Sequence, residues 1–237
     1  MPPPPSALLT LPTLLALLTT LLLATTLRLL AILPRPRNPP HRRTPPPATR
    51  VIIVLGSGGH THEMLCLLRA LNTQKYTHRT YVVSSGDAFS AQRAVAFERA
   101  LEERGDKCTG PAHYTIHTLP RARRVHQSLF TTPFSALRTL GGAFTPLLDG
   151  ELPGLIITNG PATGVIVVLA VLVLKFFNVR GAQSGGMCRT VYVESFARVR
   201  GLSLSGRLLV RVVDRFLVQW EGLEGGGGRA EFWGVLV

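Results

Sequence analysis

A glycine-rich turn followed by a histidine is the part of this sequence best suited to chemistry. Residues 51–71 read VIIVLGSGGHTHEMLCLLRAL, and the turn within them consists of Gly56, Ser57, Gly58 and Gly59 ahead of His60. Glycine lets the backbone turn sharply and approach a ligand, and the free N–H groups that open a helix favour an anion. A neutral imidazole can accept a proton near pH 7. The pattern predicts a phosphate-binding loop with His60 as candidate general base; a helix-capping role is the alternative for His60.

Apolar segments on both sides of this turn must position it. Residues 51–55 are mostly β-branched, which predicts a buried strand, and leucines recur at helical spacing through residues 64–71. Strand, glycine turn and helix are typical of the first βα unit of a doubly wound domain. Thr61 replaces the third glycine of the dinucleotide pattern, and no acidic residue ends the next strand, which disfavours a nicotinamide or flavin site. A tight turn that binds nothing is the remaining alternative.

The rest of the chain repeats the same alternation of strands and helices. Further strands are predicted at residues 79–84, 113–119, 155–158, 190–193 and 216–219, with helices at 91–104 and 165–177. Strands separated by helices predict an α/β fold, with a parallel sheet that has helices on both faces. The helix at 165–177 is apolar almost all round and short for a membrane span, which favours burial against the sheet.

A second glycine turn opens that last helix. It contributes four candidate anion-binding residues, Asn159, Gly160, Thr163 and Gly164. In a doubly wound sheet of order 3-2-1-4-5-6, the first and fourth strands are neighbours, and ligands bind where the strand order reverses. The two turns are therefore expected to face one crevice. Arg121, in the basic segment 120–128, is a further candidate for pyrophosphate, with a solvated basic loop as the alternative.

Net charge and the N-terminus indicate a membrane protein. The 237 residues carry a formal net charge of +13, which implies an acidic partner such as nucleic acid, an anionic membrane or a phosphorylated substrate. Arginines crowd behind an uncharged stretch at residues 7–27, and no RNA-binding aromatic motif is found. Three cysteines without metal-ligand spacing predict a reducing compartment and no metal site.

The uncharged stretch is long enough to cross a bilayer. At 1.5 Å per residue it spans about 30 Å, which predicts a transmembrane anchor; a cleaved signal peptide is the alternative. Arginines on its C-terminal side place the domain in the cytosol. The predicted organisation is a lumenal segment at 1–6, an anchor at 7–33, and a proline- and arginine-rich linker at 34–50 that holds the domain off the membrane. An acceptor-binding domain at 51–220 and a C-terminal tail at 221–237 follow.

Longer motifs resemble a known family. The segments LGSGGHTHEML, YVVSSGD, LIITNGPATGV, VYVESFARV and FWGVLV occur in order over nearly all of residues 51–237. They are similar to the asparagine-linked glycosylation protein 14 family, the membrane-anchoring subunits of the endoplasmic reticulum UDP-N-acetylglucosamine transferase that makes dolichol-linked chitobiose. A more distant resemblance is to the N-terminal half of the bacterial glycosyltransferase that adds N-acetylglucosamine to lipid-linked muramyl peptide.

This resemblance implies one half of a divided enzyme. The fold would be a Rossmann-like domain equivalent to the N-terminal half of a two-domain GT-B glycosyltransferase. The chain would bind the lipid acceptor at the cytosolic face of the endoplasmic reticulum, with the nuclear envelope as a second location. A soluble partner would carry most of the UDP-sugar site, within a heterodimer or a larger assembly of the pathway, and no cofactor is implied. The alternative is a non-catalytic scaffold for the soluble subunit.

Two further sets of residues complete the predictions. Glu194 ends a strand at the ligand edge and is a second catalytic candidate; capping of the next segment or pairing with Arg198 is the alternative. Glu63, in the first turn of a helix, is explained by the helix dipole. The apolar chain end follows a glycine run, residues 225–228, that is expected to interrupt order. The apolar residues of the chain end predict a docking surface for the soluble partner; a tail that folds back on its own sheet is the alternative. These residues are Phe232, Trp233, Val235, Leu236 and Val237.

Overall fold

The computed structural model describes residues 11–34, 50–122, 132–160 and 162–237. An N-terminal helix, α1 (Leu11–Ile32), precedes a domain of alternating strands and helices. The strands are β1 (Arg50–Val54), β2 (His78–Ser84), β3 (Tyr114–Leu119), β4 (Leu155–Thr158), β5 (Arg189–Val193), β6 (Arg215–Val218) and β7 (Ala230–Phe232). The helices are α2 (Gly59–Leu67), α3 (Ala88–Glu103), α4 (Thr132–Leu148), α5 (Thr163–Phe176) and α6 (Leu204–Leu209). The predicted segment 1–6, residues 7–10 of the predicted anchor, residues 35–49 of the predicted linker and residues 123–128 of the predicted basic segment lie outside the described residues.

The strands form one parallel sheet in the order β3-β2-β1-β4-β5-β6-β7. The doubly wound α/β fold predicted from the sequence is therefore confirmed, with β1 and β4 as central neighbours. Val54 at the end of β1 pairs with Thr158 at the end of β4 and with Val82, so β1 and β4 end level and β2 continues to Ser84. The sequence predicts six strands, and the described residues contain a seventh, β7, which comes from the predicted tail.

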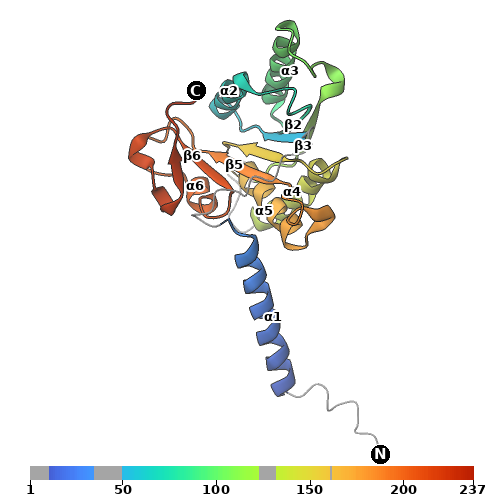
Figure 1. The fold of residues 1–237 in the computed structure, drawn as a ribbon, viewed down its shortest axis with the longest axis vertical. Coiled ribbons are helices and arrows are strands. Elements are labelled where there is room, and N and C mark those ends of the chain that lie inside the picture. The colour runs from blue at the N-terminus through green and yellow to red at the C-terminus, as the bar shows by residue number, and fades with distance from the viewer. Residues whose placement is uncertain (1–10, 35–49, 123–131, 161) are drawn as a thin grey trace, which may run out of the picture.

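Two helical layers cover the sheet. Figure 1 shows α2 and α3 on one face, and α4, α5 and α6 on the face toward α1. Alternate residues of β1 supply both cores: Ile52 and Val54 pack with α4 and α5, whereas Val51 and Ile53 pack with α2. Helix α5 is apolar on nearly every side because it contacts the sheet, α1, α4 and α6 together. The prediction of a helix buried against the sheet is confirmed.

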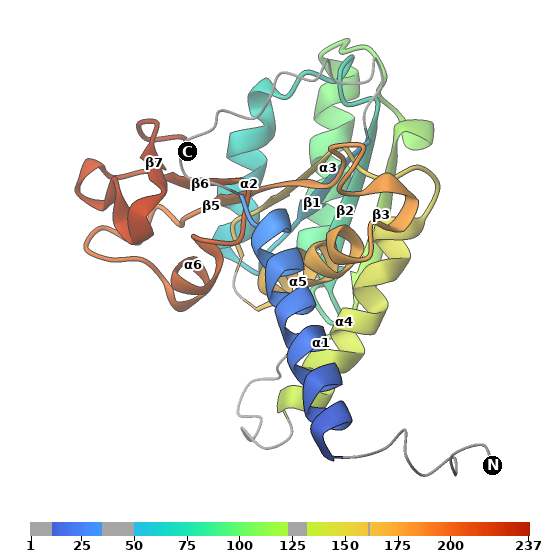
Figure 2. The ribbon, with the colours of Figure 1, turned by 60° about the horizontal axis from the view of Figure 1, so that its bottom comes forward.

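Helix α1 is held against the domain by an arginine. The guanidinium of Arg28 donates through Nε to the carbonyl oxygen of Phe176 at 2.8 Å and through a terminal nitrogen to that of Lys175 at 2.9 Å. These are carbonyls at the C-terminal end of α5, where a positive charge is favourable. Ile32 is buried at the same junction, and Figure 2 shows α1 lying over α5 between α4 and α6. The domain therefore contacts the C-terminal part of α1 directly.

The glycine run 225–228 is a packed turn. Gly225, Gly227 and Gly228 have positive φ, and a Cβ atom on Gly227 would lie 2.6 Å from a methyl group of Val210, which follows α6 directly. The N–H of Gly225 donates to the carbonyl oxygen of Ala230 at 2.9 Å. The prediction that this run interrupts order is therefore wrong: its glycines allow a close turn against α6 that leads into β7.

Candidate functional site

Two glycine turns meet at the carboxyl ends of β1 and β4. A Cβ atom built on Gly160 would lie 3.0 Å from Cα of Gly56 and 3.3 Å from its backbone nitrogen. Because a side-chain carbon does not fit at that distance from a rigid backbone, glycine permits this approach. The structure therefore brings together the two turns that the sequence places at the point where strand order reverses.

Asn159 connects the second turn to His60 on the first. Its side-chain Nδ2 donates to the carbonyl oxygen of His60 at 2.7 Å, and the asparagine is almost completely buried. Gly56 lies close to the same histidine, since a Cβ atom there would be 2.7 Å from Cβ of His60. The side chain of His60 is 32% exposed. Its backbone is thus fixed by both turns while part of its ring remains accessible.

Buried polar atoms without partners gather at this place. Among the described residues, four buried side-chain polar atoms lack a hydrogen-bond partner: His60 Nδ1, Glu63 Oε2, Asn159 Oδ1 and one guanidinium nitrogen of Arg229. The first three belong to residues at or beside the two turns. Buried polar groups are normally paired, and an unpaired one costs about 1–3 kcal/mol. Such a cluster is expected where a polar ligand completes the hydrogen bonds.

The helices that follow both turns present their N-termini without a side-chain cap within the described residues. Helix α2 follows Gly58, with φ 62° and ψ −121°, and α5 follows Ala162, with φ 42° and ψ −71°. Positive φ in an alanine is strained by about 1–3 kcal/mol, and such strain clusters at ligand sites. Cβ atoms on Gly58 and Gly59 would meet nothing within 4 Å, so the space beside the first turn is open. Uncapped N–H groups and helix dipoles both favour an anion there.

The other predicted anion-binding residues have mixed surroundings. Ser57 is exposed on the first turn. Thr163 Oγ1 lies 2.8 Å from Ser84 Oγ, which ties the start of α5 to the end of β2. A Cβ atom on Gly164 would clash with the hydroxyl of Thr158, so this glycine is needed for packing of α5 on β4. Any contact of Gly164 with a ligand would be through its backbone N–H.

Glu194 is buried at the end of β5 and secures the start of α6. Its Oε2 accepts hydrogen bonds from Ser203 N at 3.0 Å and Ser203 Oγ at 3.1 Å, and Ser203 caps α6 through Gly206 N. Burial and the Glu194 carboxylate raise the pKa of nearby Tyr192 above its usual range. This geometry favours the capping interpretation of Glu194 over the catalytic one.

Arg121 lies beside the ends of β2 and β3. Its Nε donates to the carbonyl oxygen of Ser85 at 2.7 Å, and a terminal nitrogen donates to that of Gly86 at 3.3 Å. With Arg138 it lines a hollow of about 760 Å³ that contains neither glycine turn. The structure therefore does not bring Arg121 into contact with the other predicted site residues.

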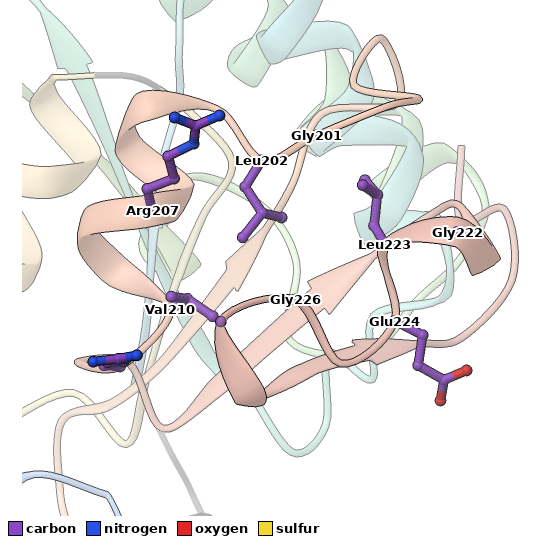
Figure 3. A pocket seen from close by; sticks show the side chains of 10 residues that line it. Gly201, Leu202, Arg207, Val210, Gly222, Leu223, Glu224 and Gly226 are labelled. Atoms are coloured by element: carbon purple, nitrogen blue, oxygen red, sulfur yellow. The ribbon is translucent and has the colours of Figure 1, made fainter.

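A further pocket, of about 500 Å³, lies between α6 and the glycine run (Figure 3). Leu202, Val210 and Leu223 form its apolar walls, and Arg207, Arg211 and Glu224 add charge. Its lining includes Gly226 and Gly227 of the run 225–228 and none of the described residues of the turns after β1 and β4, so this pocket is separate from the candidate site.

The predicted docking residues divide between the sheet and the surface. Phe232 ends β7 and packs against a buried core cluster. The ring of Trp233 lies 4.4 Å from the guanidinium carbon of Arg215 yet is 56% exposed, and Val235 and Val237 are also exposed. The N–H of Leu236 donates to Gln219 Oε1 at 3.1 Å. The first part of the tail thus folds back on its own sheet, whereas its last residues present an apolar surface.

Glu63 and Ser195 belong to the site but were not among the predicted site residues. Ser195 Oγ donates to Glu63 Oε1 at 2.9 Å, and Glu63 Oε2 lies 3.9 Å from His60 Nδ1. The i,i+3 spacing of His60 and Glu63 was a local signal that they share a helix face. The contact with Ser195 spans 132 residues of sequence, so no local pattern indicates it.

A family model and two relatives agree on one family. A family model described as "Oligosaccharide biosynthesis protein Alg14 like" matches residues 51–236. The UDP-N-acetylglucosamine transferase subunit alg14 of Schizosaccharomyces pombe is 41% identical over 188 residues, covering 78% of this chain and 82% of that protein. The human subunit of the same name is 37% identical over 174 residues, covering 73% and 76%. Among solved structures, Acinetobacter baumannii MurG aligns with a TM-score of 0.49 and 12% identity, covering 78% of this chain and 45% of that one.

Proposed function

This chain belongs to the family of Alg14-like oligosaccharide biosynthesis proteins, and from that premise we propose that it is the membrane-anchoring, acceptor-binding subunit of a UDP-N-acetylglucosamine transferase. Its acceptor would be N-acetylglucosaminyl-diphosphodolichol, to which a second N-acetylglucosamine is added in protein N-glycosylation. A soluble cytosolic subunit would supply most of the UDP-sugar site. The pair would correspond to the two halves of a GT-B glycosyltransferase, and this chain would be inactive alone.

The meeting of the two glycine turns is the observation that carries this proposal. A lipid diphosphate brings at least two negative charges, and two uncapped helix N-termini converge where β1 and β4 end. The open space beside Gly58 and Gly59 allows the backbone to approach a phosphate without interference from side chains. The buried unpaired oxygen of Asn159 adds a hydrogen-bond acceptor for a sugar hydroxyl or amide.

His60 is the proposed general base. The ring nitrogen Nε2 would take the proton of the attacking acceptor hydroxyl as the acceptor oxygen forms a bond to C1 of the donor sugar. The bond between C1 and the UDP oxygen would break at the same time, and UDP would leave with that electron pair. A positioned base of this kind typically contributes about 10²- to 10⁴-fold in rate.

Helix α1 is the proposed membrane anchor. It has 22 residues, or about 33 Å of helix, and 21 of them are uncharged. Arg28, near its C-terminal end, and the arginines that follow favour the cytosol for that end, in the endoplasmic reticulum membrane. Protease protection on sealed microsomes tests this topology. Residues 51–237 should be digested without detergent, and protection of this region would refute the orientation.

The exposed end of the tail is the proposed docking surface for the soluble subunit. Trp233, Val235 and Val237 offer an aromatic anchor within an apolar surface, a composition common at interface hot spots. Figures 1 and 2 both show the C-terminus beside α2, the helix that carries His60. A partner bound there would lie close to the acceptor crevice.

A reconstituted transfer assay tests the function and separates it from the scaffold alternative. The purified chain, with and without its soluble subunit, is given UDP-N-acetylglucosamine and the lipid diphosphate acceptor. Transfer should require both subunits. His60→Ala and Gly58→Val should lower turnover about 100-fold or more at saturating partner while pull-down of the partner stays unchanged. Wild-type turnover by both variants would leave only the scaffold role.

A further inference from the structure

Glu63 stands between His60 and the end of β5. His60 and Glu63 are one turn apart on α2, and His60 Nδ1 lies 3.9 Å from Glu63 Oε2. The other carboxylate oxygen, Oε1, accepts a hydrogen bond from Ser195 Oγ at 2.9 Å. Ser195 is itself buried, and its Oγ also accepts from Ala197 N at 3.3 Å. The loop after β5 therefore holds the carboxylate beside the imidazole.

The two atoms that face each other are both buried and unpaired within the described residues. An unpaired buried carboxylate oxygen is unfavourable, and a neutral imidazole with its proton on Nδ1 could relieve it. A small side-chain rotation would shorten 3.9 Å to a hydrogen bond of about 2.8 Å. Catalytic hydrogen bonds are often long before substrate binds and tighten in the complex. A small rotation is therefore enough to form the hydrogen bond between His60 Nδ1 and Glu63 Oε2.

We infer that Glu63 is a positioning residue that sets the tautomer of His60, an inference that rests on the proposed role of His60 as base. A proton held on Nδ1 by Glu63 leaves the lone pair on Nε2 free, because a neutral imidazole carries one proton. Since Nδ1 is buried and the ring is partly exposed, the Nε2 side is the one that an acceptor hydroxyl can reach. Ser195 in turn orients Glu63, as a third group commonly orients a base.

Interaction with the helix dipole does not explain this arrangement. A dipole contact in the first turn needs only an exposed carboxylate near free N–H groups. Glu63 is instead largely buried, with a hydrogen bond to Ser195 in the loop after β5 and its second oxygen turned toward His60. The hydrogen bond from Ser195 fixes the orientation of the Glu63 carboxylate, and an interaction with the helix dipole does not require a fixed orientation.

Glu63→Gln is the variant that tests the tautomer. Ser195 Oγ already accepts from Ala197 N, so its own proton stays directed at Glu63 and keeps the oxygen of the new amide there. The amide nitrogen then faces Nδ1 as a donor, which forces the imidazole proton onto Nε2 and blocks its role as base. Ser195→Ala should weaken the orientation, and Ser195→Thr, which keeps a hydroxyl, should restore it. His62→Ala, an exposed histidine on the same helix, is the matched control.

Turnover is measured with the full-length chain in complex with its soluble subunit, UDP-N-acetylglucosamine and a lipid diphosphate bearing one N-acetylglucosamine. Glu63→Gln should lower kcat about 10- to 100-fold with less than about 3-fold change in acceptor KM, and His62→Ala should match the wild type. In the double variant, Glu63→Gln should not lower kcat below that of His60→Ala alone. The effects of residues that act as a unit are not additive.

Three outcomes would overturn the inference or its premise, and they are distinguishable. Wild-type kcat in Glu63→Gln, with His60→Ala impaired, refutes the positioning role alone. An equal loss from Glu63→Gln in the wild-type and His60→Ala backgrounds shows a structural role instead. Wild-type turnover in His60→Ala refutes the proposed base. Partner pull-down and the protease-resistant core of each variant show that the complex is intact.

Discussion

Gly160→Ala should damage both stability and turnover by forcing the two glycine turns apart. The new Cβ would lie 3.0 Å from Cα and 3.3 Å from N of Gly56, and both are backbone atoms. Carbon atoms in contact are normally about 3.5–4.0 Å apart, so a shift of roughly 0.5–1 Å is required. Gly160 does not have positive φ, so steric crowding is the only physical cause.

The size of that shift sets the expected magnitudes. Forcing one extra carbon into a packed site costs about 1–3 kcal/mol of unfolding free energy. A misplacement of about 1 Å in a catalytic arrangement can lower the rate about 10²-fold. His60 is displaced indirectly, because its carbonyl oxygen is bonded to Asn159, the neighbour of Gly160. We therefore expect kcat to fall by about 10- to 100-fold at saturating acceptor.

Gly141→Ala is the matched control. Gly141 lies within α4, and a Cβ there would meet nothing within 4 Å, so alanine should stabilise the helix by up to about 1 kcal/mol. Urea unfolding of the detergent-solubilised protein gives the free energies, and the reconstituted transfer assay gives kcat. If Gly160→Ala matches Gly141→Ala in both measurements, the turns are not in the contact described, and the crevice has another form.

Three further predictions concern the domain. Glu98→Gln should lower the free energy of unfolding of the domain by about 3–5 kcal/mol, because Glu98 and Arg79 form a fully buried pair with 2.7 Å bonds. An unchanged midpoint of urea unfolding would contradict this. Deletion of residues 233–237 should release the soluble subunit in a pull-down while the protease-resistant core survives, because β7 ends at Phe232; retention of the partner would remove the docking role. Burial raises the pKa of Cys188 to about 11, above its unfolded value. The neutral thiol therefore stabilises the fold below about pH 9, and this contribution to stability is lost as the pH rises through 11. Because the thiol stays neutral and buried at about pH 8, iodoacetamide should not modify Cys188 at that pH.

The doubly wound sheet could be predicted from the sequence because its signals are local. Five β-branched or apolar residues before Gly56, and a similar strand before Asn159, identify β1 and β4 without any knowledge of distant contacts. Handedness and the common strand order then place both glycine turns at one edge. The meeting of Gly56 and Gly160 follows from these rules.

The features that could not be predicted depend on contacts between distant residues. The β7 strand has only three residues, and it forms because β6 leaves an open edge and Phe232 reaches a core cluster. In the sequence Glu63 is an ordinary carboxylate in the first turn of a helix, and only the folded structure shows its hydrogen bond with Ser195. Glu194 ends a strand at the ligand edge, as a catalytic residue would, but the loop after β5 turns Ser203 onto its carboxylate.

Helix α5 connects α1, the proposed anchor, to the candidate site. Its C-terminal carbonyls accept both hydrogen bonds from Arg28, and its N-terminus follows the second glycine turn. Fourteen residues separate these ends by about 21 Å. Because α5 contacts β1, α1 and α4, a change in the position of α1 is expected to act on α5 as a whole. Under the proposed topology, the hydrogen bonds of Arg28 would therefore fix the orientation of α5, and of the second glycine turn at its start, relative to the membrane.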